Sequence, residues 1–159
     1  MGKTIKREGG CACGGVRYAL RGAPLFTHGC HCTWCQRETG SALALNAMVE
    51  TDRLELIKGR VALVHTPSAS GRGQVIARCS HCQVALYSHY PGLGDKIAFL
   101  RVGTLDAGHG ISPDVHIFTS TKQPWVVLGE GVPIREEYYD RRELWPKESL
   151  ARLTALRGQ

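Results

Sequence analysis

Seven cysteines in three tight clusters constrain this chain more than any other feature. The first cluster is a Cys-x-Cys pair at Cys11 and Cys13, and the last is a Cys-x-x-Cys pair at Cys79 and Cys82. The middle cluster consists of Cys30, Cys32 and Cys35. Buried cysteines that act as small hydrophobic residues do not account for such spacings. Because the count is odd and no secretory signal is apparent, a disulfide framework is also disfavoured, and the clusters indicate metal binding.

The spacing divides the seven thiols into a set of four and a set of three. The Cys79–Cys82 turn supplies two zinc ligands and needs a second pair. In extended chain, residues two apart share a face, so Cys11 and Cys13 can point at the same ion. The three middle cysteines have no fourth cysteine to join them. Structural zinc sites have four protein ligands and catalytic sites keep an open position, so we predict two zinc ions, one structural and one catalytic.

Three alternatives stay open at the level of sequence. His28 or His31 could close the three-cysteine group, which would leave two structural zinc ions and no chemistry. The clusters could also pair differently in space, because spacing does not say which of them meet. An iron–sulfur cluster would use similar thiolates, but the three-sulfur group would then need a fourth cysteine or a histidine, so zinc is favoured.

Charge and hydropathy exclude several classes of partner. The chain has 20 Lys and Arg against 14 Asp and Glu, a formal net charge of +6. Two zinc ions on seven thiolates would lower this to about +3, because coordinating thiols are deprotonated. The basic residues form no tract, so we expect no nucleic-acid partner, whereas a small anionic substrate is compatible. The chain has no membrane-length apolar run, and residues 1–6 lack the apolar stretch of a secretory signal, so we expect a cytoplasmic protein without a membrane partner.

The sequence between the cysteines predicts a single, mainly β domain. Eight short β-rich runs alternate with turn-forming groups. The runs are 16–20, 43–49, 54–57, 61–65, 74–78, 84–89, 97–102 and 115–119. One helix is predicted at the C-terminus, because Pro146 can open it and Gly158 can end it. Leu150, Leu153 and Leu156 fall near one face of that helix, and we expect them to pack against the core.

Four ordered segments resemble the glutathione-dependent formaldehyde-activating (GFA) family, whose domain also occurs in centromere protein V. The segments are 10–18 around the first cysteine pair, 30–40, 79–82 and 116–125. The resemblance spans roughly residues 5–135, which predicts a GFA-type zinc-binding domain over that range. Residues 136–159 are expected to form a helical C-terminal extension.

The resemblance also implies a fold, a pair of metal sites and an activity. The fold is an Mss4-like set of antiparallel sheets with a short C-terminal helix. The structural zinc is assigned to Cys11, Cys13, Cys79 and Cys82. The catalytic zinc is assigned to Cys30, Cys32 and Cys35. The implied activity is that of a carbon–sulfur lyase, S-(hydroxymethyl)glutathione synthase, with a thiol such as glutathione and a small aldehyde as partners. A non-catalytic, zinc-ordered binding module is the alternative, and the sequence does not indicate an oligomeric state.

Glutathione carries two carboxylates, so basic residues near the motifs are candidate anchors. We name Arg37 and Lys122, with Arg101 as a further candidate and Trp125 as an apolar wall.

Two residues depart from the family pattern. Gln83 stands where glycine usually follows the second cysteine of the third motif, and Arg78 precedes Cys79 where an aromatic residue is common. A glycine at position 83 would ease a left-handed turn, so Gln83 argues against the usual backbone geometry of this turn, whereas metal binding itself should survive.

Overall fold

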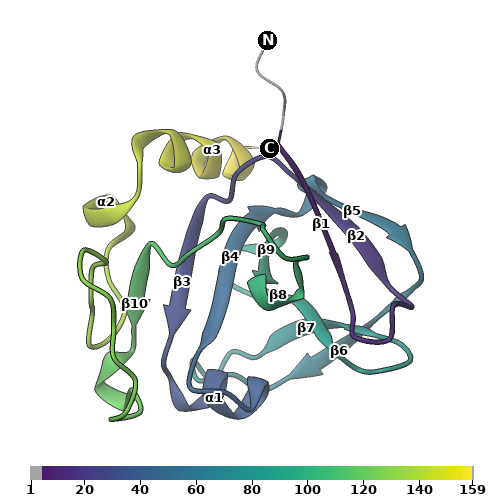
Figure 1. The fold of residues 1–159 in the computed structure, drawn as a ribbon. Helices are drawn as coiled ribbons and strands as arrows, with labels where there is room; N and C mark the ends of the chain where they lie inside the picture. The colour runs from purple at the N-terminus through teal and green to yellow at the C-terminus, as the bar shows by residue number, and fades with distance from the viewer. Residues whose placement is uncertain (1–4, 159) are drawn as a thin grey trace.

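The computed structural model describes residues 5–158 as two β-sheets, with the C-terminal helix at one end of the larger sheet and a short helix at the opposite end (Figure 1). The strands are β1 (Lys6–Gly10), β2 (Arg17–Arg21), β3 (Phe26–Cys30), β4 (Ala44–Glu50), β5 (Leu54–Lys58), β6 (Val61–Thr66), β7 (Gln74–Cys79), β8 (Ala85–Tyr90), β9 (Gly94–Arg101) and β10 (Val115–Ile117). The helices are α1 (Thr33–Thr39), α2 (Arg141–Leu144) and α3 (Lys147–Arg157). Residues 1–4, part of the segment that informed the expectation about a secretory signal, lie outside the described residues.

The strand pairing confirms the mainly β class. One sheet has the order β1-β2-β5, and the other has the order β10-β3-β4-β9-β8-β7-β6. Neighbouring strands are antiparallel except β10 and β3, which are parallel, with Val115 opposite His28 and Ile117 opposite Cys30. The larger sheet is therefore mixed, and its β3 and β10 strands come from distant parts of the chain.

Three elements near the cysteine motifs, β1, β3 and α1, were not predicted from the sequence. The strand β3 is buried at every position, so it lacks the alternation that marks a half-exposed strand. It also contains Gly29, where a Cβ would lie 2.6 Å from Nδ1 of His116, so the close approach of that ring requires glycine. The helix α1 is seven residues long and buries none of them, and so it has no apolar stripe to reveal it.

The core consists of two hydrophobic clusters, and each contains cysteines from one motif group. The first cluster includes Cys11 and Cys79 together with Leu20, Leu86 and Leu100. The second lies beneath α3 and includes Cys30. Each group of thiols therefore includes at least one cysteine that is packed into the hydrophobic core.

The C-terminal helix forms where the sequence predicted it. It follows Pro146 and ends at Gly158, and Leu150, Leu153 and Leu156 all belong to or pack against the second cluster. A bidentate ion pair also fixes it to the sheet, because Arg152 Nε and Nη2 donate to the buried Glu50 carboxylate of β4 at 2.8 and 2.6 Å. Among the described residues no helix is both long and apolar enough to cross a membrane.

Candidate metal centres and the adjoining cavity

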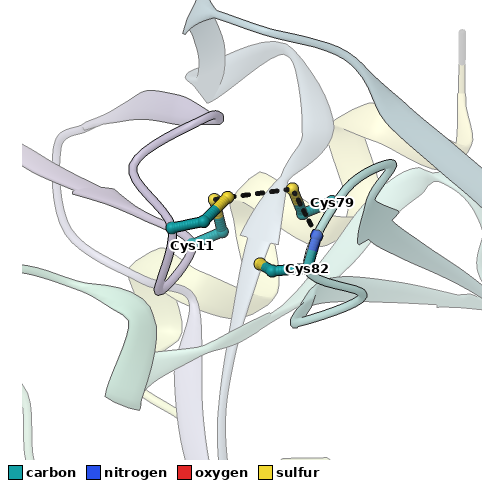
Figure 2. A group of neighbouring side chains, drawn as sticks. Cys11, Cys79 and Cys82 are labelled. Atoms are coloured by element: carbon teal, nitrogen blue, oxygen red, sulfur yellow. Dashed lines mark hydrogen bonds between the residues drawn. The ribbon is translucent and has the colours of Figure 1, made fainter.

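Four of the cysteines converge from two separate hairpins. Cys11 and Cys13 lie in the turn after β1, while Cys79 ends β7 and Cys82 lies in the turn that follows (Figure 2). Their four sulfurs all lie within 4.8 Å of one another, with 3.5 Å between Cys11 and Cys13 and 3.8 Å between Cys13 and Cys79. Sulfurs bound to one zinc ion in a tetrahedron are about 3.8 Å apart. The spacing of this group therefore suits zinc.

Backbone amides surround these sulfurs and favour their thiolate form. The Val16 N–H donates to Cys11 Sγ at 3.2 Å, and the Gly15 N–H donates to Cys13 Sγ at 3.4 Å. Burial would raise the pKa of Cys11, but the Val16 N–H and the neighbouring thiols lower it to about 6. The Gly15 N–H lowers the pKa of Cys13, but competition with Cys11 and the other thiols raises it to about 11. A cation is needed before all four sulfurs can be thiolates at neutral pH, which is the donor chemistry of a zinc site.

Each hairpin of the four-cysteine group contains one residue in the left-handed conformation. Gly14 has φ 72° in the first hairpin, and Gln83 has φ 64° in the second. The Gln83 N–H donates to the Cys79 carbonyl at 3.1 Å, and the Gly14 N–H donates to the Cys11 carbonyl at 3.2 Å. The second turn therefore keeps the left-handed geometry at Gln83 although the sequence lacks glycine there.

We expect Gln83→Gly to raise the free energy of unfolding by up to about 1 kcal/mol, because glycine adopts a positive φ without the steric cost of a Cβ. The opposite substitution in the other hairpin, Gly14→Gln, serves as the matched variant and should lower the free energy of unfolding by about 1 kcal/mol. A Cβ at Gly14 meets nothing within 4 Å, so this substitution adds only backbone strain. Urea denaturation of zinc-loaded protein measures both. Changes of the same sign in the two variants would contradict this explanation.

The other three cysteines meet where β3 passes into α1. Cys30 is the last residue of β3, Cys32 is the N-cap of α1, and Cys35 lies in the helix. Their sulfurs also lie within 4.8 Å of one another, and the Cys35 N–H donates to Cys32 Sγ at 3.3 Å. The structure thus brings together the set of three that the spacing suggested.

The three thiols share a single readily formed negative charge. Hydrogen bonds from Cys30 and Cys35 lower the pKa of Cys32 to about 2. Interaction with Cys32 and Cys35, together with burial, raises the pKa of Cys30 far above its usual value. Cys30 lowers the pKa of Cys35, but Cys32 and burial raise it to about 12. A second and a third thiolate therefore require a bound cation, so this group could hold a metal ion.

Neither candidate histidine joins this group. His31 is fully buried, and its Nε2 lies 3.0 Å from Nδ1 of His116. His28 Nε2 lies 2.7 Å from the Tyr139 hydroxyl. Burial lowers the pKa of both His28 and His31 to about 4. Within residues 5–158 no histidine or carboxylate ligand atom lies within 4.8 Å of all three sulfurs, so the group offers three protein ligands.

A cavity of about 330 Å³ opens beside the three sulfurs. Aromatic side chains form much of its wall, namely Trp34, Tyr90, Phe99, Phe118 and Tyr138. The loop between β6 and β7 contributes Ser68, Ala69 and Ser70. Nothing in the sequence pointed to this loop, because it lies more than 30 residues from the cysteines it faces and contains no motif.

The structure places three of the four anchor candidates away from the cavity. Arg37 is exposed on α1, and Trp125 is 72% exposed. Lys122 Nζ donates to the carbonyls of Gln123 and Val126 at 3.0 and 2.6 Å, so it stabilises its own loop. None of the three lines the cavity, whereas Arg101 does.

Comparison with known proteins finds similarity to a protein family and to solved structures. A protein-family model described as glutathione-dependent formaldehyde-activating enzyme (GFA) matches residues 6–121. The crystal structure of a Rhodobacter sphaeroides protein is similar at 19% sequence identity, over 67% of this chain and 91% of that chain, with a TM-score of 0.48. A search of the curated proteins gives no match.

Proposed function

Because this chain belongs to the glutathione-dependent formaldehyde-activating enzyme family, we propose that it is a zinc-dependent carbon–sulfur lyase-type enzyme. In the proposed reaction, which resembles that of S-(hydroxymethyl)glutathione synthase, glutathione is joined to formaldehyde or a related small aldehyde. One observation carries the proposal beyond family membership. Three convergent sulfurs without a fourth protein ligand form part of the wall of a cavity of about 330 Å³, large enough for a small substrate.

The two cysteine groups have different roles in this proposal. Cys11, Cys13, Cys79 and Cys82 hold a structural zinc ion between two hairpins. Cys30, Cys32 and Cys35 hold the second zinc ion, which, when bound, supplies a position for a substrate sulfur as thiolate. Seven free cysteines fit a reducing compartment such as the cytoplasm, where glutathione is available as the thiol.

The reaction is the addition of a thiol to a carbonyl group. A carbon–sulfur bond forms, the π bond of the aldehyde opens, and the thiol proton goes to the carbonyl oxygen. The cavity contributes by holding both reactants together, so that a reaction between two solutes becomes one within a complex. Its aromatic walls give the reactants a mainly apolar surface to pack against.

The proposal is tested by exchange NMR on glutathione and formaldehyde, because the two also combine without an enzyme. Zinc-loaded protein should increase the exchange rate between free glutathione and its hydroxymethyl adduct in proportion to protein concentration. Arg142→Ala serves as the control variant and should retain this effect, since Arg142 pairs with Asp140 on the surface. An exchange rate that stays at the uncatalysed value while two zinc ions are bound would favour the binding module instead.

A further inference from the structure

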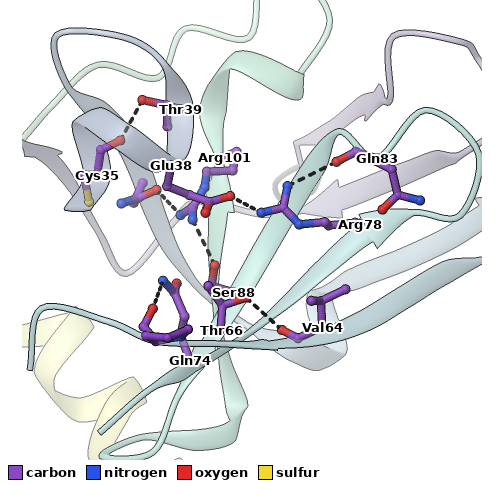
Figure 3. Close-up of polar contacts among 12 residues, drawn as sticks. Cys35, Glu38, Thr39, Val64, Thr66, Gln74, Arg78, Gln83, Ser88 and Arg101 are labelled. Carbon is purple, nitrogen blue, oxygen red and sulfur yellow. Dashed lines mark hydrogen bonds and ion pairs between the residues drawn. The ribbon is translucent and has the colours of Figure 1, made fainter. Parts of the chain in front are cut away.

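Arg101 is a buried cation that no carboxylate of residues 5–158 pairs with, and its charge lowers the pKa of Cys35. It ends β9 and is only 8% exposed, and it is the only Lys or Arg whose side chain lines the cavity among residues 5–158. Its Nη1 donates to Asn46 Oδ1 on β4 at 2.6 Å, and its Nη2 donates to Ser88 Oγ on β8 at 3.0 Å (Figure 3). Both partners are neutral, and they brace the guanidinium from the two neighbouring strands. Its Nε has no hydrogen-bond partner in the described part of the chain.

Among residues 5–158, the one acidic residue that lines this cavity is already paired. Glu38 lines the same cavity, but its carboxylate accepts from Arg78, and the ion pairs of residues 5–158 do not include Arg101. A buried charge is strongly unfavourable unless it is paired, and the chain itself offers Arg101 only the thiolates of the three-cysteine group among the described residues. The guanidinium still has N–H groups that no carboxylate of residues 5–158 accepts from, and the cavity that it lines has room for an anion from solution.

A second unpaired group lies on a different wall of the cavity. Gln74, at the start of β7, is 7% exposed, and its Nε2 donates to the Pro67 carbonyl at 3.3 Å. A carbonyl can only accept, so this contact fixes the orientation of the amide and leaves Oε1 as an acceptor. No donor reaches Oε1 from the described residues. Figure 3 shows the Gln74 carboxamide and the Arg101 guanidinium in the same region as Cys35.

We propose that Arg101 and Gln74 determine which thiols the site accepts. Arg101 binds a carboxylate of the substrate through its free N–H groups, and Gln74 accepts a hydrogen bond from a substrate N–H group. The substrate class is then an amino-acid or peptide thiol with a carboxylate, and neutral thiols without an N–H group bind poorly. This inference rests on the proposed function, because it describes the substrate of the same cavity.

Calorimetric titration of the zinc-loaded protein with matched ligands tests the inference without any activity measurement. Glutathione should bind at least about tenfold more tightly than glutathione diethyl ester, which keeps the thiol but has no free carboxylate. S-methylglutathione, which keeps the carboxylates but lacks the thiol, should still bind measurably. Equal affinities for glutathione and its diethyl ester would overturn the inference, and this comparison requires no variant to fold.

Two substitutions assign the effect to residues. Arg101→Gln should lower the affinities for glutathione and 3-mercaptopropionate at least about tenfold. It should change the affinity for 2-mercaptoethanol less than about twofold. Arg101→Lys keeps the charge and should preserve part of the preference for carboxylates. Gln74→Leu should lower the affinity for glutathione but not that for 3-mercaptopropionate, which has no N–H group.

The outcomes separate this inference from the proposed function. If Arg101→Gln weakens all thiols equally and lowers the zinc content, Arg101 only balances the charge of the thiolates, and the inference fails while thiol binding stands. A different result is that glutathione binds no more tightly than S-methylglutathione, and that Arg101→Gln weakens the binding of S-methylglutathione. Recognition of the carboxylate by Arg101 would then stand, and the binding of a substrate thiolate at the zinc ion would be wrong. If neither glutathione nor S-methylglutathione binds, both are wrong.

Discussion

Cys79→Ser is expected to lower the free energy of unfolding of the zinc-loaded protein by about 4 kcal/mol or more, because it removes a ligand from a group of four. For a chain of this length, that corresponds to a fall in melting temperature of roughly 10 °C. Cys79 is 1% exposed and is the strand residue that brings the two hairpins together in Figure 2. Its sulfur also accepts from the backbone N–H groups of His81 and Cys82, so the turn itself is weakened.

Cys32→Ser provides the matched control for this result. Cys32 is half-buried at the cavity and caps α1, and serine is one of the preferred N-cap residues, so the helix keeps its cap. We expect a fall in melting temperature of only a few degrees. Differential scanning calorimetry, with and without a chelator, gives both values, and the chelated wild-type and Cys79→Ser proteins should melt close together. An equal fall in melting temperature in the two zinc-loaded variants would show that the four-cysteine and three-cysteine groups do not differ in structural role.

The sequence predicts the cysteine groups well because their geometry is mostly local. Side chains two or three residues apart in a turn have few possible relative orientations. The sulfurs of Cys30, Cys32 and Cys35 therefore come together through local backbone geometry. The remaining step, the meeting of the Cys11 and Cys79 hairpins, follows from counting ligands. The fold class is also readable, because strands such as β7 and β9 have enough β-rich residues to be recognised.

The polar lining of the cavity is not readable from the sequence in the same way. Proximity in sequence to a motif selected Arg37 and Lys122, neither of which lines the cavity. Arg101, named only as a further candidate, lines it because β9 lies between β4 and β8. Gln74 reaches it only because the β6–β7 loop folds over the same region. Such neighbours depend on strand order, and strand order involves residues far apart in the chain. A basic side chain on a short β-rich run gives no sign of whether it will be buried.

The second large effect concerns the position that the three sulfurs leave free. Cys32→Ser should reduce the zinc content from two ions per chain to one and weaken glutathione binding about a hundredfold, since one of three ligands is lost. His28→Ala should keep two zinc ions, because His28 Nε2 is engaged by the Tyr139 hydroxyl and does not approach the sulfurs. His31→Ala should also keep them, since His31 pairs with His116 behind the turn. Elemental analysis of each purified variant measures the zinc content.

The affinity for glutathione should rise with pH if glutathione binds as a thiolate, whereas binding as a neutral thiol would give no such rise. If glutathione binds as thiolate, binding releases a proton, so its affinity should rise with pH until the free thiol itself is ionised. S-methylglutathione has no such proton, and its affinity should not show this rise. Absence of the rise would contradict an open position, and so would loss of the second zinc ion in His28→Ala or His31→Ala. Either histidine result would make that residue a fourth ligand, and the closed site would then belong to a binding module rather than to an enzyme.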